Sequence, residues 1–150
     1  MTSEHAETID FIHNMQKQYC DYLDGGDVDS LLSMFTTDCE FYAPSGQSTG
    51  KAAFEDLIRA AIDRHEPNSG RHVIGTGITY CANESTVYST VPFIYVNFDE
   101  NTVVMSGEYL DRWERIDNQW LLGARDVRVV NGPRAESRWA AESTHPVANT

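Results

Sequence analysis

Two residues suited to acid–base chemistry stand at the ends of predicted elements: Asp24 in LDGGD, where a helix ends, and His72 in GRHVIG, where a sheet begins. Taken singly, an aspartate before Gly-Gly is a common helix exit, and a strand histidine is commonly structural. As a pair they could also take part in acid–base catalysis. An imidazole can act as a base near neutral pH, and a carboxylate bonded to its other nitrogen would set its tautomer and stabilise the imidazolium. Together they could act as a general base.

Further candidates lie on predicted strands. Strand alternation predicts that Asp126 shares a face with Leu122 and Ala124, and Asp111 is a second strand carboxylate. Arg128 could orient a substrate oxygen or pair with a carboxylate. For Asp111 and the charged residues that follow it, the alternative is cross-strand ion pairing on a solvated or dimer-forming face.

The residues predict neither a metal site nor a cofactor site. The five histidines have no ligand spacing, and no glycine-rich phosphate loop occurs. The three cysteines, Cys20, Cys39 and Cys81, are odd in number and lack a Cys-x-x-Cys pair, which predicts buried reduced thiols. Any chemistry is therefore expected to be cofactor-free.

The amino-acid composition limits the classes of molecule that this protein is expected to bind. The 150 residues fit one domain, and 11 basic against 23 acidic side chains give a net charge of −12. Such a charge repels phosphate backbones and anionic lipids, so neither nucleic acid nor a membrane is expected as a partner. The polar N-terminus has no signal-peptide pattern, and no apolar run reaches the ~18 residues of a membrane span. We expect a cytoplasmic protein that acts on a small molecule.

The first seventy residues predict helices that would position the candidate base. Apolar residues at spacings of three and four predict a helix over 4–23, followed by a short helix with Asp27 at its N-cap. A third helix is predicted over about 51–64. Between them, 39–44 is predicted as a short strand and 45–50 as a loop.

Residues 71–130 predict four consecutive strands, rich in β-branched and aromatic residues and separated by short polar turns. The expected architecture is α+β: a strongly bent, mostly antiparallel sheet wrapped around the N-terminal helices, with a pocket between the layers. The domain is expected to span 1–133. A polar tail over 134–150, with Trp139 as its only large apolar anchor, would be frayed or lie across a neighbouring subunit.

A homodimer is also expected, because the outer face of such a sheet commonly pairs with a second copy. The apolar side chains assigned to this outer surface are Trp113, Leu121, Val127 and Val129.

Three segments together resemble a known family: YCDYLDGGDVDSLLSMFTTDCEFY, GRHVIGTGI and SGEYLDRWERIDNQWLLGARDVRVV. Over roughly residues 8–130 the chain resembles the SnoaL-like branch of the NTF2-like superfamily. The resemblance implies a cone-shaped α+β fold. Within the branch the chain is most similar to the scytalone dehydratase, bile acid 7α-dehydratase and hexachlorocyclohexane dehydrochlorinase types, which use a histidine–aspartate pair to remove a proton from carbon.

Matched residue by residue, the resemblance implies that Asp24 and His72 form the pair and that Tyr19 and Tyr42 are catalytic tyrosines. Two polar positions of those enzymes are lost here, since a second histidine falls near Phe93 and an aspartate near Tyr95. The sequence thus offers a residue that could act as the general base of an elimination, but no matching residue for the general acid. The residues predicted to contact substrate are Phe93, Tyr95, Tyr109, Asp126 and Arg128.

The favoured function is a cofactor-independent lyase or isomerase of the dehydratase type, acting on an apolar small molecule such as an intermediate of secondary metabolism. Limonene epoxide hydrolase and the polyketide cyclases of the superfamily carry a working aspartate in the last strand. An epoxide hydrolase or a polyketide cyclase, with Asp126 or Asp111 as the acid or base, is therefore an alternative function. A third alternative is a domain that only binds a ligand.

Overall fold

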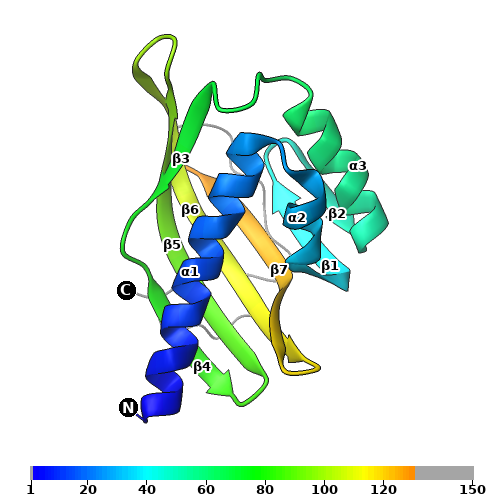
Figure 1. The fold of residues 1–150 in the computed structure, drawn as a ribbon, viewed down its shortest axis with the longest axis vertical. Coiled ribbons are helices and arrows are strands. Elements are labelled where there is room, and N and C mark those ends of the chain that lie inside the picture. Colours follow the sequence, from blue (N-terminus) through cyan, green and yellow to red (C-terminus); the bar gives the residue numbers. More distant parts are fainter. Residues whose placement is uncertain (1, 131–150) are drawn as a thin grey trace.

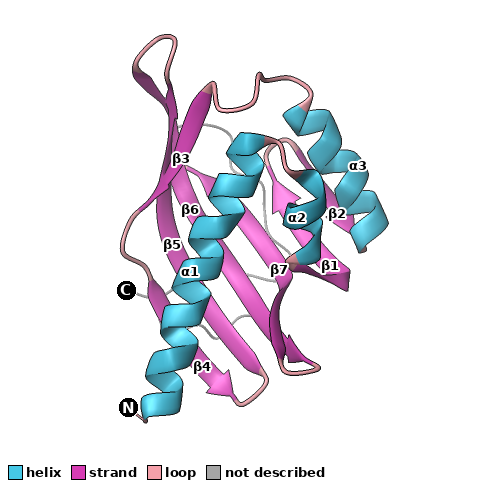
Figure 2. Cartoon of the chain, in the orientation of Figure 1, coloured by secondary structure: helices cyan, strands magenta, loops and turns pink. Residues whose placement is uncertain are grey.

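A single curved sheet organises the molecule, and helices cover its concave face (Figures 1 and 2). The computed structural model describes residues 2–130. In chain order the elements are α1 Ser3–Gly25, α2 Val28–Ser33, β1 Phe35–Ala43, β2 Gly46–Thr49, α3 Lys51–Ile62, β3 Gly70–Ile74, β4 Ile78–Asn83, β5 Thr86–Asn97, β6 Thr102–Ile116 and β7 Gln119–Val129.

The strand order is β2-β1-β7-β6-β5-β3, and β4 also pairs with β5. Every strand pair is antiparallel except β1 with β7, which is parallel. The predicted α+β class, with a bent and mostly antiparallel sheet around N-terminal helices, is confirmed. None of the helices in this part of the chain combines the length and apolar character needed to cross a bilayer.

The two ends of α1 follow from local chemistry. The Thr2 side chain accepts a hydrogen bond from the His5 amide, and Gly26 closes the other end with φ 72°, a conformation that glycine adopts without steric cost. Asp27 accepts from the Ser30 amide, so the predicted N-cap of the second helix is confirmed. The chain therefore makes a sharp turn immediately after the end of α1, close to Asp24.

Local patterning misplaced some strand ends. The segment predicted as one strand over 71–81 is divided into β3 and β4, both paired with β5. The break contains Gly77, where a Cβ would overlap the Thr90 carbonyl oxygen, so this segment passes too close to β5 for any side chain. The loop predicted over 45–50 contains β2, and β1 begins at Phe35 rather than at residue 39. Both differences arise from cross-strand pairing, which local polarity does not reveal.

A bulge at Gly123 shifts the faces of β7. Arg112 pairs with Ala124 and Trp113 with Leu122, which leaves Gly123 unpaired. Leu122 consequently packs in the main core, whereas Ala124 lies in a small cluster on the outer face. The prediction that Asp126 shares a face with Leu122 is therefore wrong, although it does share one with Ala124.

The outer-face residues also need a correction. Trp113, Val127 and Val129 belong to the main core on the concave side, so the prediction that they form an outer apolar surface is wrong. The homodimer itself stays a prediction. The predicted domain end at 133 and the tail 134–150, with Trp139, lie outside the described residues.

Burial sets the state of the thiols. Cys20 and Cys39 are buried, which raises the pKa of Cys20 to about 12 and that of Cys39 to about 11, and Cys81 is half-buried. At pH 8 a thiol with a pKa of about 12 is ionised in roughly one molecule in 10⁴. We expect iodoacetamide to label Cys81 first, and Cys20 and Cys39 only after unfolding in urea, as measured by peptide mass spectrometry. Labelling of Cys20 at equal rates in folded and unfolded protein would contradict this expectation.

Candidate active site

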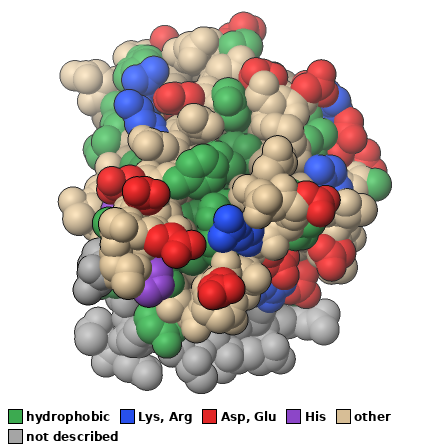
Figure 3. Space-filling view, turned by 60° about the horizontal axis from the view of Figure 1, so that its bottom comes forward, with side chains coloured by type: hydrophobic (Ala, Val, Ile, Leu, Met, Phe, Trp, Pro, Cys, Tyr) green, Lys and Arg blue, Asp and Glu red, His purple; other side chains and the backbone are tan. Residues whose placement is uncertain are grey.

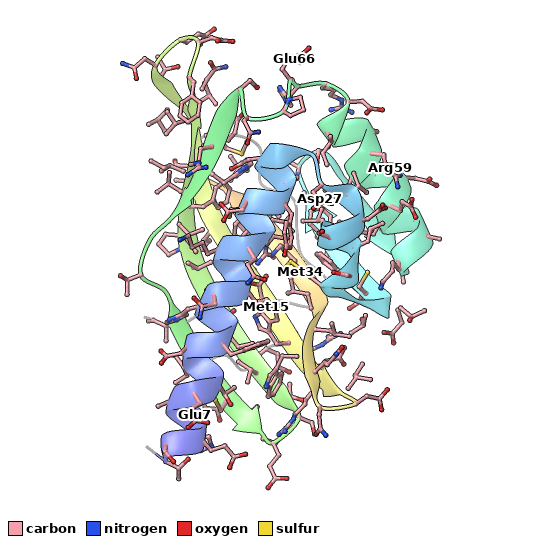
Figure 4. The ribbon with its side chains drawn as sticks, viewed as in Figure 1. Glu7, Met15, Asp27, Met34, Arg59 and Glu66 are labelled. Atoms are coloured by element: carbon pink, nitrogen blue, oxygen red, sulfur yellow. The ribbon has the colours of Figure 1, made fainter. Side chains whose placement is uncertain are left out.

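A cavity of about 360 Å³ lies between the concave face of the sheet and the helices. Most of its wall is apolar, and side chains such as Phe41, Leu57, Ile58, Ile62, Met105 and Val127 line it. Charged lining residues other than Asp24 come from the segment that joins α3 to β3, where Arg64, His65 and Glu66 are exposed (Glu66 is labelled in Figure 4). The cavity volume and apolar lining suit a small and largely apolar ligand.

The structure brings Asp24 and His72 into direct contact although they are 48 residues apart. Asp24 Oδ1 lies 2.6 Å from His72 Nδ1, and Asp24 Oδ2 accepts from the His72 backbone amide at 2.7 Å. The carboxylate is therefore bound twice by one residue, which aligns the end of α1 with β3. Because the carboxylate is an acceptor, the neutral imidazole carries its proton on Nδ1, and the lone pair of Nε2 is left for chemistry.

Aromatic side chains from β5 and β6 continue the wall beside His72. The imidazole centroid is 4.7 Å from that of Tyr95 and 5.9 Å from that of Phe93. The Tyr109 ring stacks on Phe93 at 4.3 Å, and Tyr19 meets Tyr109 edge-on at 5.8 Å. Four of the predicted site residues, Tyr19, Phe93, Tyr95 and Tyr109, thus line the cavity together with the Asp24–His72 pair.

Three predicted site residues lie on the other face of the sheet. Tyr42 pairs with Asp126 across β1 and β7, and Arg128 Nε donates to Asp126 Oδ2 at 3.0 Å. Their strand neighbours, Phe41 and Val127, line the cavity instead. Since successive strand residues point to opposite faces, the expectation that Tyr42, Asp126 and Arg128 reach the cavity is wrong.

A buried ion pair lies behind the cavity wall, and sequence reasoning, which considered Asp111 and Arg125 as candidate acid–base groups, did not predict that they pair with each other. Arg125 donates twice to the Asp111 carboxylate, from Nε at 2.7 Å and from Nη2 at 2.8 Å, and both side chains are fully buried. The guanidinium carbon lies 4.0 Å from the Tyr19 ring centroid and 4.2 Å from that of Tyr109. The alternation of Arg125 with Val127 and Val129 is the signal that places Arg125 on the inner face.

Buried polar groups hold the ion pair in place. The Ser89 hydroxyl accepts from Gln16 Nε2 at 3.0 Å and from Trp113 Nε1 at 2.9 Å, and it donates to Asp111 Oδ2 at 3.4 Å. This network links α1, β5 and β6 to the ion pair behind the cavity wall. It gives Gln16, Ser89, Trp113 and Asp111 hydrogen-bond partners, whereas Arg125 Nη1 has none within the described part of the chain.

Burial also sets the state of the two tyrosines beside Arg125. It raises the pKa of Tyr19 to about 12, against the opposing effect of the Arg125 cation, and it raises the pKa of Tyr109 well above its ordinary value. Burial alone would lower the pKa of Arg125, but the Asp111 carboxylate reverses this and raises it. At neutral pH both phenols therefore keep their protons and can donate hydrogen bonds to a ligand oxygen.

Within residues 2–130, no group of three or more histidine, cysteine, aspartate or glutamate side chains is arranged to hold a metal ion. Acidic side chains outnumber basic ones on the molecular face shown in Figure 3, in keeping with the net charge of −12.

Comparison with known proteins supports the fold and the family. A family model described as a SnoaL-like domain matches residues 4–126, and no curated protein sequence matches the chain. A solved structure of a protein named as a candidate scytalone dehydratase, from Novosphingobium aromaticivorans, is 22% identical with a TM-score of 0.77. The match covers 92% of this chain and 94% of that one.

Two further structures are of proteins of unknown function. One, from Nostoc punctiforme, has a cystatin-like fold, a TM-score of 0.75 and 20% identity, with 88% of this chain and 96% of that chain covered. The other, from Mycobacterium tuberculosis, has a TM-score of 0.73 and 19% identity, with 99% and 85% covered. Identities this low establish a common fold alone. Since the family model matches most of its length, the chain belongs to the SnoaL-like family and has the NTF2-like fold.

Proposed function

We propose that this protein is a cofactor-independent lyase or isomerase that removes a proton from a carbon atom of a small, largely apolar molecule. One observation carries the proposal: the Asp24 carboxylate is held by both the ring and the backbone of His72 in the wall of an apolar cavity. An imidazole in that position is oriented, and its charged form has a counter-ion.

In the proposed reaction His72 Nε2 takes the proton. The C–H electron pair forms a carbon–carbon double bond, and the electrons of an adjacent carbonyl move to its oxygen. The developing oxyanion accepts hydrogen bonds from Tyr19 or Tyr109, whose phenols stay protonated at neutral pH. Asp24 balances the imidazolium meanwhile. No step needs an oxidant or a reductant.

The proton must then leave His72. Apart from the tyrosines and the exposed segment that contains Glu66, the titratable groups that line the cavity are Asp24 and His72. We infer that His72 returns its proton, either to a departing hydroxide, which leaves as water, or to a second carbon atom. The first outcome is elimination and the second is isomerisation.

The predicted alternative in which Asp126 or Asp111 opens an epoxide or closes a ring has no comparable support. Asp126 lies on the outer face of the sheet, where it accepts a hydrogen bond from Arg128, and Asp111 forms a buried ion pair with Arg125. A domain that only binds a ligand would use the same cavity, and loss of turnover in His72 variants would exclude it.

Substituting Asp24→Asn tests the pair without a substrate. A carboxylate offers two acceptor oxygens to the two donors of His72, whereas an amide offers one. We expect long-range ¹H–¹⁵N NMR spectra to show His72 protonated at Nδ1 in the native protein, and to show a mixture of tautomers in Asp24→Asn.

The matched control is Asp21→Asn, one turn earlier on α1 and exposed. It should leave the His72 spectrum unchanged. A native His72 protonated at Nε2, or an identical tautomer in native protein and Asp24→Asn, would refute the proposed pair.

A further inference from the structure

The second partner of His72 is an aromatic ring. His72 and Tyr95 are directly opposite in the antiparallel pairing of β3 with β5, and both line the cavity. Their ring centroids are 4.7 Å apart at an interplanar angle of 46°, closer than the 5.9 Å that separates His72 from Phe93. Asp24 therefore holds the imidazole at Nδ1, while the Tyr95 ring packs against the imidazole in a tilted contact.

A missing side chain makes room for this ring. A Cβ at Gly70 would overlap the hydroxyl oxygen of Tyr95 and would lie 2.5 Å from its Cζ atom. Gly70 precedes His72 by two residues on β3, so both belong to the same face of the strand. The spacing Gly-x-His on one strand thus provides both the imidazole and the space that the neighbouring Tyr95 ring occupies.

We propose that Tyr95 is a positioning residue for His72 and that Gly70 is required for its placement. The ring restricts the imidazole to the orientation in which Nδ1 meets Asp24 and Nε2 is free. This inference rests on the proposed role of His72 as a base.

Other charged groups near the cavity are Asp24 on α1 and the exposed Arg64, His65 and Glu66 between α3 and β3. None of them is altered by a change at residue 95. A change in His72 upon substitution of Tyr95 can therefore be attributed to the loss of the ring, provided that the fold is intact.

Three variants test the proposal by NMR of the His72 ring: Tyr95→Phe, which keeps the ring, Tyr95→Leu, which removes it, and Gly70→Ala, which displaces it. We expect Tyr95→Phe to keep the His72 tautomer and the ring-current shifts of the native protein. In Tyr95→Leu and Gly70→Ala the ring-current shift of the carbon-bound protons of His72 should be lost, and the fraction of the imidazole protonated at Nδ1 should fall.

Ile94→Ala, on the same strand with its side chain partly exposed, is the control and should leave His72 unchanged. If Gly70→Ala fails to fold, the comparison of Tyr95→Phe with Tyr95→Leu decides alone. A folded Tyr95→Leu variant with the native His72 tautomer and native ring shifts would overturn the inference. That result would leave the Asp24 experiment intact, whereas a native His72 protonated at Nε2 would overturn the proposed function itself.

Discussion

Replacing His72 by alanine is expected to lower the rate of proton removal from carbon by about 10²–10⁴-fold. Nε2 is the basic atom that the Asp24 contact leaves free, and the phenols of Tyr19 and Tyr109 are too weakly acidic to exist as bases at neutral pH. The assay is loss of carbon-bound protium in D₂O, followed by NMR, with small ketones such as cyclohexenone and 1-tetralone as probes.

Two variants separate chemistry from structure. His72→Gln keeps a side-chain donor toward Asp24 but has no basic nitrogen, so it should be as inactive as His72→Ala. His13→Ala removes a histidine that contacts Thr79 at 3.4 Å and does not line the cavity, and it should retain full activity. If exchange catalysed by the native protein survives in both His72 variants, His72 is not the base.

Replacing Asp111 by alanine is expected to lower the free energy of unfolding by about 3–5 kcal/mol. The substitution leaves the Arg125 cation without either of its hydrogen bonds to carboxylate in a site with no exposure to water. Partial compensation by the faces of Tyr19 and Tyr109 cannot replace an ionic partner. Urea unfolding, monitored by circular dichroism, measures the loss.

Removing both charges tests the reason for this effect. Asp111→Leu combined with Arg125→Met replaces the pair by apolar side chains, and it should recover most of the stability lost in Asp111→Ala. Glu55→Ala breaks the exposed pair of Glu55 with Arg59 on α3 and should change stability little. If Asp111→Ala is no more destabilising than Glu55→Ala, the buried pair does not carry the energy assigned to it.

The helical half of the molecule was predictable because its signals are local. Apolar spacing located α1 and α3, and the glycines after Asp24 and the N-cap at Asp27 located the turn between α1 and α2. The resemblance also selected Asp24 and His72, which the structure brings into contact. Helix periodicity and capping depend on neighbours within a few residues, so the chain itself contains the information.

The strand residues were harder to assign. The inner and outer faces of β7 were assigned by simple alternation, which ignored the bulge at Gly123. The same alternation was not applied to Tyr42 on β1 or to Arg125 on β7. Tyr42 and Asp126 were therefore expected in the cavity, and the pairing of Arg125 with Asp111 was not predicted. The residues of β2 were expected as a loop because four polar and small residues become a strand only by pairing with β1.

By itself the sequence determined the fold class, the helices, and the residue types available for acid–base chemistry. Only the tertiary structure decided which strand side chains face the cavity, and that the Asp111–Arg125 pair lies behind its wall, in contact with Tyr19 and Tyr109. The physical reason is that one unpaired residue in a strand reverses the face of the residues beyond it. Whether a residue is left unpaired depends on the neighbouring strand, far away in the sequence.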